Sequence, residues 1–158
     1  MTPADFIAKW QANTRTERAA CQEHFIDLCR LLDEPTPNTD ATGEDYAFEK
    51  GATKFTGQDG WADVWRRGRF AWEYKKKKRD LAKALEQLTR YAAALENPPL
   101  HVACDTHLFR IETRWTNEVP AKYEFELDDL AEPRNLALLQ AAFFEPEKLR
   151  SGRTRAKL

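Results

Sequence analysis

The chain has 158 residues, which is enough for one domain with a hydrophobic core but too few to expect two domains. Hydrophobic residues make up 42% and charged residues 32%, a composition that argues against intrinsic disorder. The formal net charge of −1 excludes a domain that holds nucleic acid by its overall charge, so local basic segments, at 66–69, 75–79 and 150–157, must meet any polyanion.

No segment of the sequence is suited to a membrane or to secretion. The longest uninterrupted apolar segments have only a few residues, so we expect no transmembrane helix. The N-terminus lacks the basic and apolar regions of a secretion signal. Cys21, Cys29 and Cys104 lack metal-site spacing, and the first two are expected to be buried small side chains in a reducing compartment. We therefore predict a cytoplasmic protein with no membrane partner.

Two helices are predicted ahead of a polar loop. Thr2 as the N-cap, with Pro3 at the first helical position, indicates the start of one helix. Apolar residues at helical spacing predict a second helix from Thr16 to Asp33. Two prolines, a glycine and many small polar residues make Glu34 to Asp45 a loop. We assign residues 1–45 to the same domain as the sheet that follows.

From Tyr46 the apolar period changes from that of helices to that of strands. A helix from Leu81 to Glu96, capped by Asp80, separates the third and fourth strands, and further helices begin at Asp128 and Pro133. This order predicts an α/β fold with a central mixed sheet flanked by helices, in which 46–145 form the core and the basic tail 146–158 starts a connector. The predicted strands are Tyr46–Phe55, Trp61–Trp65, Arg69–Lys75, Leu100–Cys104, Thr106–Trp115 and Tyr123–Leu127, with a turn at Gln58–Gly60.

The second and third predicted strands form a hairpin with a glycine in its loop. A loop of Arg66-Arg67-Gly68 places the glycine at the third position, where three-residue hairpins favour positive φ. In this register Trp65 faces Arg69 and Asp63 faces Ala71. A two-residue loop would instead bury Asp63 among aromatic side chains at a high energetic cost. The three-residue loop is therefore the favoured prediction.

Three charged side chains fall on one face of this hairpin. Strand side chains alternate, so Asp63, Glu73 and Lys75 point to the same side of the sheet. Two carboxylates on adjacent strands suit a hard divalent cation, and the backbone carbonyl of Tyr74 is a further candidate ligand. Lys75 is placed to orient an attacking water or to stabilise charge that develops on phosphorus. These residues alone could also be solvated positions on a half-exposed strand.

Basic residues at the mouth of this cluster predict contact with a phosphate backbone. The run Lys76, Lys77, Lys78 and Arg79 follows the hairpin directly, although such a run is by default a solvated linker. Arg67 in the hairpin loop and Trp65 on the charged face are further candidate DNA contacts. The three histidines show no ligand spacing and are expected to be structural. The sequence has neither a glycine-rich phosphate loop nor a serine nucleophile motif, so the chemistries that depend on them lack support.

The pattern Asp63, nine residues, Glu73, one residue, Lys75 resembles that of the PD-(D/E)XK nuclease superfamily. Proline usually precedes the first acid of this motif, and this chain has alanine there. The following helix bears Gln87 and Tyr91, similar to a Gln-x-x-x-Tyr signature of many members. The resemblance implies that Gln87 contacts a carboxylate or water, and that Tyr91 packs in the core or contacts phosphate. Another acid, Glu49, sits where some members place an additional metal ligand, although it could equally be a surface residue.

Most of the chain resembles the N-terminal nuclease domain of MmeI-like enzymes. The shared segments are "TPADFIAKW", "ERAACQEHFIDLCRLL", "YAFEKGA", "DVWRRGRFAWEYKKKK" and "FFEPEKLRSGRTR". The resemblance implies a restriction-endonuclease-like fold and Mg²⁺- or Mn²⁺-dependent cutting of double-stranded DNA. It also implies a type IIG or IIL restriction–modification protein for phage defence, in which a connector, an adenine-N6 DNA methyltransferase and a target-recognition domain follow. S-adenosylmethionine would bind only in those later domains, and dimerisation on DNA is expected for a double-strand break.

Two alternatives remain open at this point. The domain could be a catalytically silent scaffold that positions DNA for a methyltransferase, although all three motif residues are present. It could also belong to a repair or phage-defence nuclease that acts on ends, junctions or single strands. A generic protein–protein module would leave the charged face of the hairpin unexplained.

Overall fold

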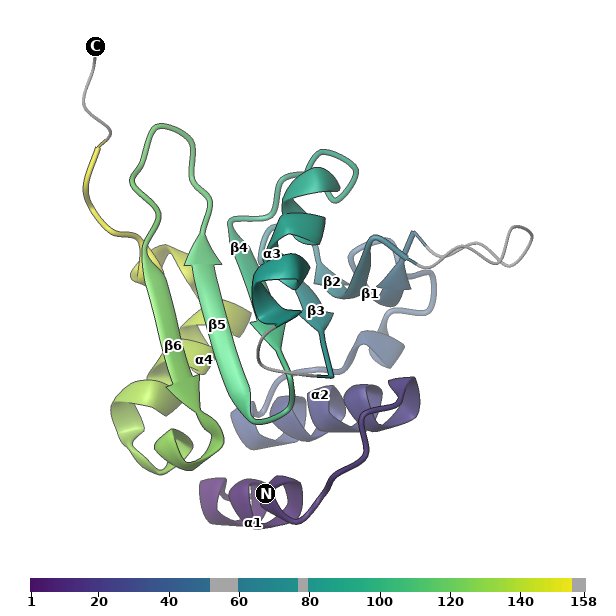
Figure 1. Ribbon diagram of the computed structural model, residues 1–158. Coiled ribbons are helices and arrows are strands. Elements are labelled where there is room, and N and C mark those ends of the chain that lie inside the picture. The colour runs from purple at the N-terminus through teal and green to yellow at the C-terminus, as the bar shows by residue number, and fades with distance from the viewer. Residues whose placement is uncertain (52–59, 77–79, 155–158) are drawn as a thin grey trace.

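A mixed β-sheet forms the centre of the molecule in the computed structural model, which describes residues 1–51, 60–76 and 80–154. Over these residues the sheet has six strands in the order β1-β2-β3-β4-β5-β6 (Figure 1). The pair β3–β4 is parallel and all other neighbouring pairs are antiparallel. The predicted α/β class with a mixed sheet is confirmed. The strands are β1 (Tyr46–Lys50), β2 (Ala62–Arg66), β3 (Phe70–Tyr74), β4 (Leu100–Cys104), β5 (Leu108–Thr113) and β6 (Lys122–Glu126).

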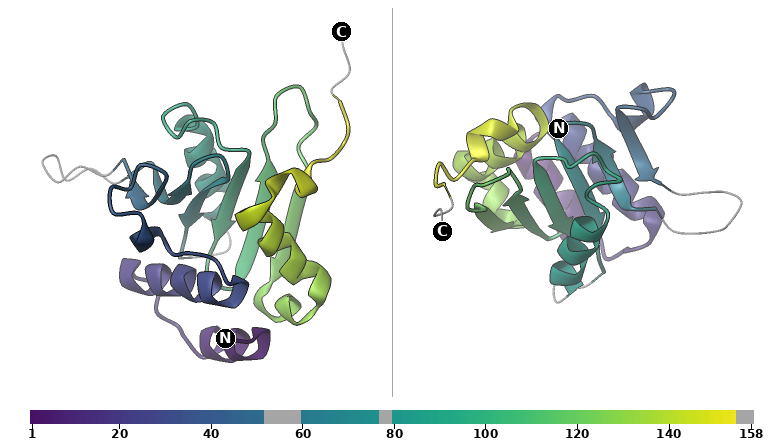
Figure 2. Two further views of the ribbon diagram at one scale, coloured as in Figure 1. Left: turned by 180° about the vertical axis from the view of Figure 1, so that it is seen from behind. Right: turned by 90° about the horizontal axis from the view of Figure 1, so that it is seen from above.

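The parallel pair requires a crossover connection, and α3 (Leu81–Arg90) supplies it. This helix covers one face of the sheet, where Leu88 packs with Trp65 and Ala71. The other face is covered by α2 (Arg18–Leu32) and α4 (Pro133–Phe144), and α1 (Pro3–Gln11) lies beyond α2 near the ends of the strands, as the views in Figure 2 show. The sheet is therefore enclosed between helices on both sides. Short 3₁₀ turns complete the fold at η1 (Pro37–Thr39), η3 (Leu127–Ala131) and η4 (Pro146–Leu149).

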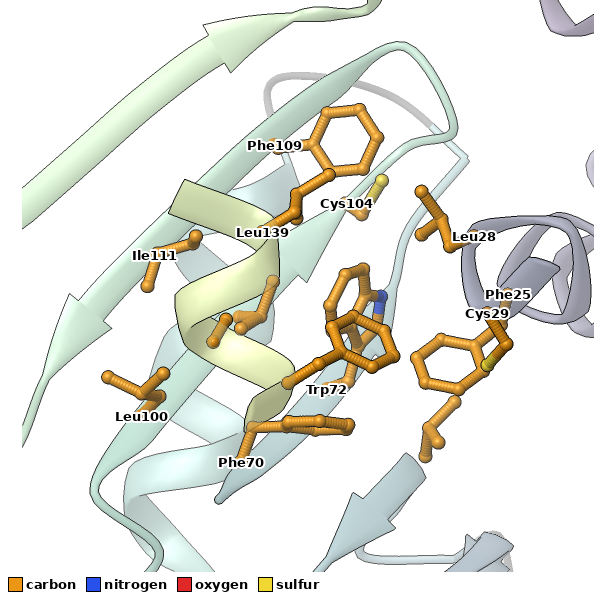
Figure 3. Packing of buried hydrophobic residues seen from close by; sticks show 14 of the residues in the cluster. Phe25, Leu28, Cys29, Phe70, Trp72, Leu100, Cys104, Phe109, Ile111 and Leu139 are labelled. Carbon is orange, nitrogen blue, oxygen red and sulfur yellow. The ribbon is translucent and has the colours of Figure 1, made fainter. Parts of the chain in front are cut away.

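The main hydrophobic core lies on the face that α2 and α4 cover (Figure 3), and Phe6 and Trp10 of α1 belong to it. Phe25 of α2 stacks against Phe143 of α4 at a centroid distance of 5.4 Å and meets Trp72 of β3 edge-on at 5.2 Å. All three side chains are fully buried, and such aromatic pairs add to the stability that area burial provides. The N-terminal helices thus share one core with the sheet.

The start of α1 agrees with its sequence signal. Thr2 accepts a hydrogen bond from the backbone N–H of Asp5, and the carboxylate of Asp5 accepts one from the N–H of Thr2, both at 3.1 Å. Further along α1, the indole Nε1 of Trp10 donates to the buried carboxylate of Asp27 at 3.0 Å. Lys9 forms an ion pair with the same carboxylate at 2.8 Å. These contacts join α1 to α2 through the buried carboxylate of Asp27, which has a hydrogen-bond donor and an ion-pair partner on α1.

Several element ends differ from the sequence prediction. The helix predicted from Leu81 to Glu96 ends at Arg90, and turns follow up to Glu96 and Asn97, whose φ values of 62° and 48° are left-handed. Asp80 precedes this helix without a side-chain capping hydrogen bond. Strand β5 begins at Leu108, since the carboxylate of Asp105 accepts the Leu108 N–H at 2.6 Å in a turn. Elsewhere, the predicted first strand extends beyond β1, and residues 52–55 of it lie outside the described residues, as do 58–59 of the predicted turn.

The segment after α4 packs against the β5–β6 connection. Leu149 is buried, and its carbonyl accepts a hydrogen bond from the Tyr123 hydroxyl at 2.8 Å. Arg150 forms an ion pair with Glu118 at 2.5 Å and lies over the ring of Trp115. The proposed division of the chain at 45 and 146 stays a prediction. Among the helices that the structure describes, none is long and apolar enough to cross a membrane.

Candidate active site

The β2–β3 hairpin brings the predicted acids together, but in a different register from the one predicted. Arg66 pairs with Phe70 and Trp65 with Ala71, so the loop is Arg67-Gly68-Arg69 and not Arg66-Arg67-Gly68. Gly68 has φ of 70°, the conformation expected of it, at the middle of the loop. The error in register is two residues along the partner strand. Because strand side chains alternate with a period of two, this error leaves every side chain on its predicted face.

The pair of Val64 with Trp72 places the next two residues along the strands, Asp63 and Glu73, directly opposite each other. Here the carboxylates bind the neighbouring backbone: Asp63 Oδ2 accepts the N–H of Tyr74 at 2.7 Å, and Glu73 Oε1 accepts the N–H of Asp63 at 3.1 Å. Glu73 is almost fully buried and Asp63 is half-buried. The two acids are therefore held side by side by reciprocal hydrogen bonds at the end of the β2–β3 ladder.

Burial raises the pKa of both carboxyl groups. For Glu73 the pKa rises from 4.5 to about 8, because burial and the adjacent charge of Asp63 both disfavour its ionised form. The charge of Lys75 and the hydrogen bond from the amide of Gln87 lower the pKa of Glu73 and offset part of this rise. For Asp63, burial dominates, while the backbone N–H of Tyr74 holds the pKa down. The pair consequently titrates as one unit that favours a shared proton in the absence of a cation.

Lys75 and Gln87 complete the predicted catalytic group. Lys75 Nζ lies 3.8 Å from Glu73 Oε2 and donates to Gln87 Oε1 at 3.5 Å. Gln87 reaches the site from α3, and its Nε2 donates to the carbonyl of Trp61 at 3.5 Å. Asp63, Glu73, Lys75 and Gln87 all line one cavity of about 510 Å³. The structure therefore gathers all four residues that the sequence predicted as catalytic.

Tyr74 contributes its backbone and not its side chain to this cavity. Its hydroxyl lies on the opposite face of the sheet, 2.8 Å from Nδ1 of the buried His24. The N–H of Tyr74 donates to Asp63 on β2, and the carbonyl of a strand residue points to the same side as its N–H. The carbonyl predicted as a metal ligand is therefore directed toward the strand that carries Asp63.

Glu49 also lines the cavity, yet its carboxylate is engaged elsewhere. It forms an ion pair with Nε of Arg18 at a distance of 2.5 Å. The part of the chain that the structure describes contains no group of three or more His, Cys, Asp or Glu side chains that could hold one metal ion. Glu49 thus lines the same cavity as Asp63 and Glu73 while its side chain pairs with a cation from α2, and its role as a metal ligand stays a prediction.

The predicted DNA contacts have different outcomes. Trp65 is fully buried and its indole N–H donates to the carbonyl of Leu95 at 2.8 Å, so its prediction as a DNA contact is wrong. The turns that follow α3 cover the face on which it lies. Lys76 is exposed beside the cavity, which leaves it available to a phosphate. Lys77, Lys78 and Arg79 lie outside the described residues.

Two other predicted DNA contacts are accessible at the surface. Arg67 is half exposed in the hairpin loop, where it forms ion pairs with Asp45 at 2.9 Å and Glu96 at 3.1 Å. Tyr91 follows the last residue of α3, is 38% exposed and stacks on Trp61 at a centroid distance of 6.4 Å. Their contact with DNA stays a prediction.

The start of α2 forms a wall of the cavity that sequence reasoning missed. Arg18, Cys21 and Gln22 line it, at spacings of three and four residues that share one helix face. This spacing was visible in the sequence. What was not visible is that α2 begins beside the open end of the β2–β3 ladder. Cys21 is half-buried with its thiol reduced, and burial raises its pKa to about 11.

The buried histidines are structural, as predicted. His24 is enclosed by aromatic rings, and Nε2 lies 3.0 Å from the carbonyl of Thr106. Burial lowers its pKa to about 3. His101 is buried in β4, and burial lowers its pKa to about 4. Both imidazoles are therefore neutral at physiological pH and stand apart from the carboxylate pair.

Comparison with models of protein families yields a match over most of the chain. The family model described as "MmeI, N-terminal domain" matches residues 1–151. Searches of curated proteins and of solved structures found nothing similar to the chain.

Proposed function

The chain belongs to the family of MmeI N-terminal domains, and on this premise we propose that it is the metal-dependent endonuclease domain of a restriction–modification enzyme. Its substrate would be double-stranded DNA, whose phosphodiester bonds it hydrolyses. The observation that carries the proposal is the reciprocal hydrogen bonding of Asp63 and Glu73, with Lys75 3.8 Å from Glu73 in the same cavity. Carboxyl groups in a cavity whose pKa values are raised by burial and by each other are candidates for a functional site.

The carboxylate pair fits a hard divalent cation. Two buried acids with raised pKa values are unfavourable as a pair of anions, and a cation removes that repulsion. Asp63, Glu73 and the backbone carbonyl of Tyr74 would hold Mg²⁺ or Mn²⁺. When bound, such an ion polarises a phosphate oxygen and lowers the pKa of a bound water. Glu49 is left out of this set because it pairs with Arg18.

Lys75 and Gln87 act on the reacting groups from the α3 side. The hydrogen bond from Lys75 to Gln87 limits the rotamers of a long side chain and keeps its ammonium beside Glu73. From there Lys75 would orient an attacking water or stabilise negative charge that develops on the phosphate. Gln87 also donates to the carbonyl of Trp61 and so positions Lys75 relative to the start of β2.

The partners of the domain follow from the same family relationship. We propose that a connector, an adenine-N6 methyltransferase and a target-recognition domain are covalently linked to it, with S-adenosylmethionine bound in the methyltransferase. Exposed Lys76 beside the cavity supports contact with a DNA backbone without base recognition. Two copies would meet on DNA to cut both strands.

Plasmid cleavage by the full-length protein with Mg²⁺ tests the proposal. Asp63→Asn and Lys75→Ala are expected to reduce the cleavage rate at least about a hundredfold, since each removes a group that acts in the transition state. Matched controls are Asp128→Asn and Lys148→Ala, at exposed positions that do not line the cavity, which should cleave like wild type. A wild-type protein that methylates DNA but never nicks it would support the scaffold function instead.

A further inference from the structure

An acidic row crosses three strands at the cavity. Phe48 pairs with Val64 and Lys50 with Ala62, so the β1–β2 register places Glu49 opposite Asp63. The β2–β3 register in turn places Asp63 opposite Glu73. Such a row would be expected to form one three-acid metal site. Among the described residues no group of three such side chains could hold one metal ion, and the carboxylate of Glu49 pairs with Arg18 instead.

The backbone of Glu49 is unusual for its residue type. Its φ of 51° lies in the left-handed region, which glutamate rarely adopts within a strand and which costs about 1–3 kcal/mol. Its side chain is about one third exposed, lines the cavity and pairs with Arg18 at 2.5 Å. A conformation of this cost is retained at functional sites when the surrounding structure holds it. The acid is therefore placed to hold a cation at the cavity wall.

Arg18 and Lys75 approach the carboxylate pair from opposite faces of the sheet. Lys75 follows β3 and bonds to Gln87 on α3, whereas Arg18 belongs to the first turn of α2, which packs on the other face (Figure 2). Both line the cavity. Arg18 is close enough to Asp63 for its charge to lower the pKa of that carboxyl. The carboxylates thus lie between two cations, an arrangement that suits successive phosphates of one DNA strand.

The Arg18–Glu49 pair can be exchanged at low cost. The arginine side chain is 66% exposed and the glutamate 31%, and ion pairs of this exposure contribute at most about 1 kcal/mol. A guanidinium can bind a phosphate through two parallel hydrogen bonds, as it can a carboxylate, and a DNA strand presents several phosphates in a row, so a phosphate can take the place of Glu49. We propose that Arg18 binds a DNA phosphate adjacent to the one that is cut, and that Glu49 is its partner in the DNA-free protein and not a metal ligand. This inference rests on the proposed nuclease function.

DNA binding by the full-length protein, with Ca²⁺ in place of Mg²⁺ to prevent cutting, tests this subsite. Fluorescence anisotropy of a labelled duplex is measured over a series of salt concentrations. Arg18→Gln is expected to weaken binding about five- to tenfold and to reduce the salt slope by about one, as loss of one phosphate contact does. Arg18→Lys keeps the charge but loses the paired hydrogen bonds, so its DNA affinity should lie between that of wild type and that of Arg18→Gln.

A matched control lies on the same helix. Arg30 is 65% exposed and pairs with Asp27 near the other end of α2, roughly 18 Å along the axis from Arg18. Arg30→Gln should bind DNA like wild type. Thermal melting curves of Arg18→Gln and Arg30→Gln show whether either variant is unfolded. If Arg18→Gln is unfolded, Arg18→Lys replaces it in the test.

Glu49→Gln separates the two roles for this acid. Mn²⁺ binding, measured by calorimetry, should equal that of wild type, whereas Asp63→Asn should lose it. Glu49→Gln should bind DNA as tightly as wild type or up to about threefold more tightly, because Arg18 no longer has to break its ion pair with Glu49 before it binds a phosphate. Weakened Mn²⁺ binding in Glu49→Gln, or an unchanged affinity and salt slope in Arg18→Gln, would overturn the inference.

Failure of the proposed function has a different signature. If wild type never cuts DNA but Arg18→Gln still weakens binding and lowers the salt slope, the nuclease proposal fails and the phosphate subsite stands. If wild type cuts DNA while Arg18→Gln binds and cuts like Arg30→Gln, the nuclease stands and the subsite is rejected. A wild type that binds no DNA rejects both.

Discussion

Replacing Glu73 with glutamine is expected to stabilise the metal-free protein at neutral and alkaline pH. Glutamine keeps the shape of the side chain and its Oε1 can still accept the N–H of Asp63, which lies 3.1 Å from it in wild type. Its amide can donate to the carboxylate of Asp63, as a protonated Glu73 does. The substitution therefore removes a buried charge while it retains the hydrogen bonds that hold the pair.

The magnitude follows from the raised pKa. An acid whose pKa is 4.5 when unfolded and about 8 when folded stabilises the folded state fully below pH 4.5, and this contribution is lost as the pH rises to about 8. At roughly 1.4 kcal/mol per pKa unit, the loss is about 3 kcal/mol at about pH 7 and at most about 5 kcal/mol at higher pH. Glu73→Gln should avoid this loss.

Urea unfolding followed by tryptophan fluorescence, with a chelator present and over a series of pH values, measures the effect. Glu73→Gln should exceed wild type in unfolding free energy by about 3 kcal/mol near neutral pH and match it near about pH 4. Glu86→Gln, the same change at an exposed position of α3, should track wild type throughout. Added Mg²⁺ should stabilise wild type at alkaline pH and have little effect on Glu73→Gln, because binding to the folded state alone raises stability.

Two results would refute this reasoning. One is a wild-type unfolding free energy that does not fall between about pH 5 and about pH 8, which would mean that burial does not oppose ionisation of the pair. The other is a Glu73→Gln protein that is less stable than wild type at alkaline pH without metal. In that case the carboxylate of Glu73 stabilises the fold itself, and its proximity to Asp63 would not indicate a cation site.

Three further substitutions test the packing around the site by denaturant unfolding. Trp65→Phe should cost about 2 kcal/mol, since the carbonyl of Leu95 loses its buried donor, and a change below about 0.5 kcal/mol would contradict this contact. Gly68→Ala should cost about 1 kcal/mol from its φ of 70° alone, because a Cβ there meets nothing within 4 Å; an unchanged stability would show that the loop relaxes. Asp27→Ala should cost about 3 kcal/mol, as it leaves the indole N–H of Trp10 without an acceptor, and a neutral result would mean that water replaces it.

The sequence by itself determined which side chains share a face of the hairpin. Asp63 and Glu73 were expected together although the predicted register was wrong by two residues, because alternation has a period of two and is a local property of the backbone. Helix starts such as Thr2-Pro3 were predictable for the same reason, since the capping residues lie within one turn of the bonds they make.

Only the tertiary structure decided what lies above that face. Trp65 was expected at a DNA surface but is buried against Leu95, 30 residues later in the chain. Arg18 reaches the cavity because α2 packs on the far face of the sheet and begins beside this cavity, where Arg18 forms an ion pair with Glu49. Alternation and capping are set by the backbone over a few residues. The covering of a surface depends on contacts between distant segments, and local patterns carry no information about them.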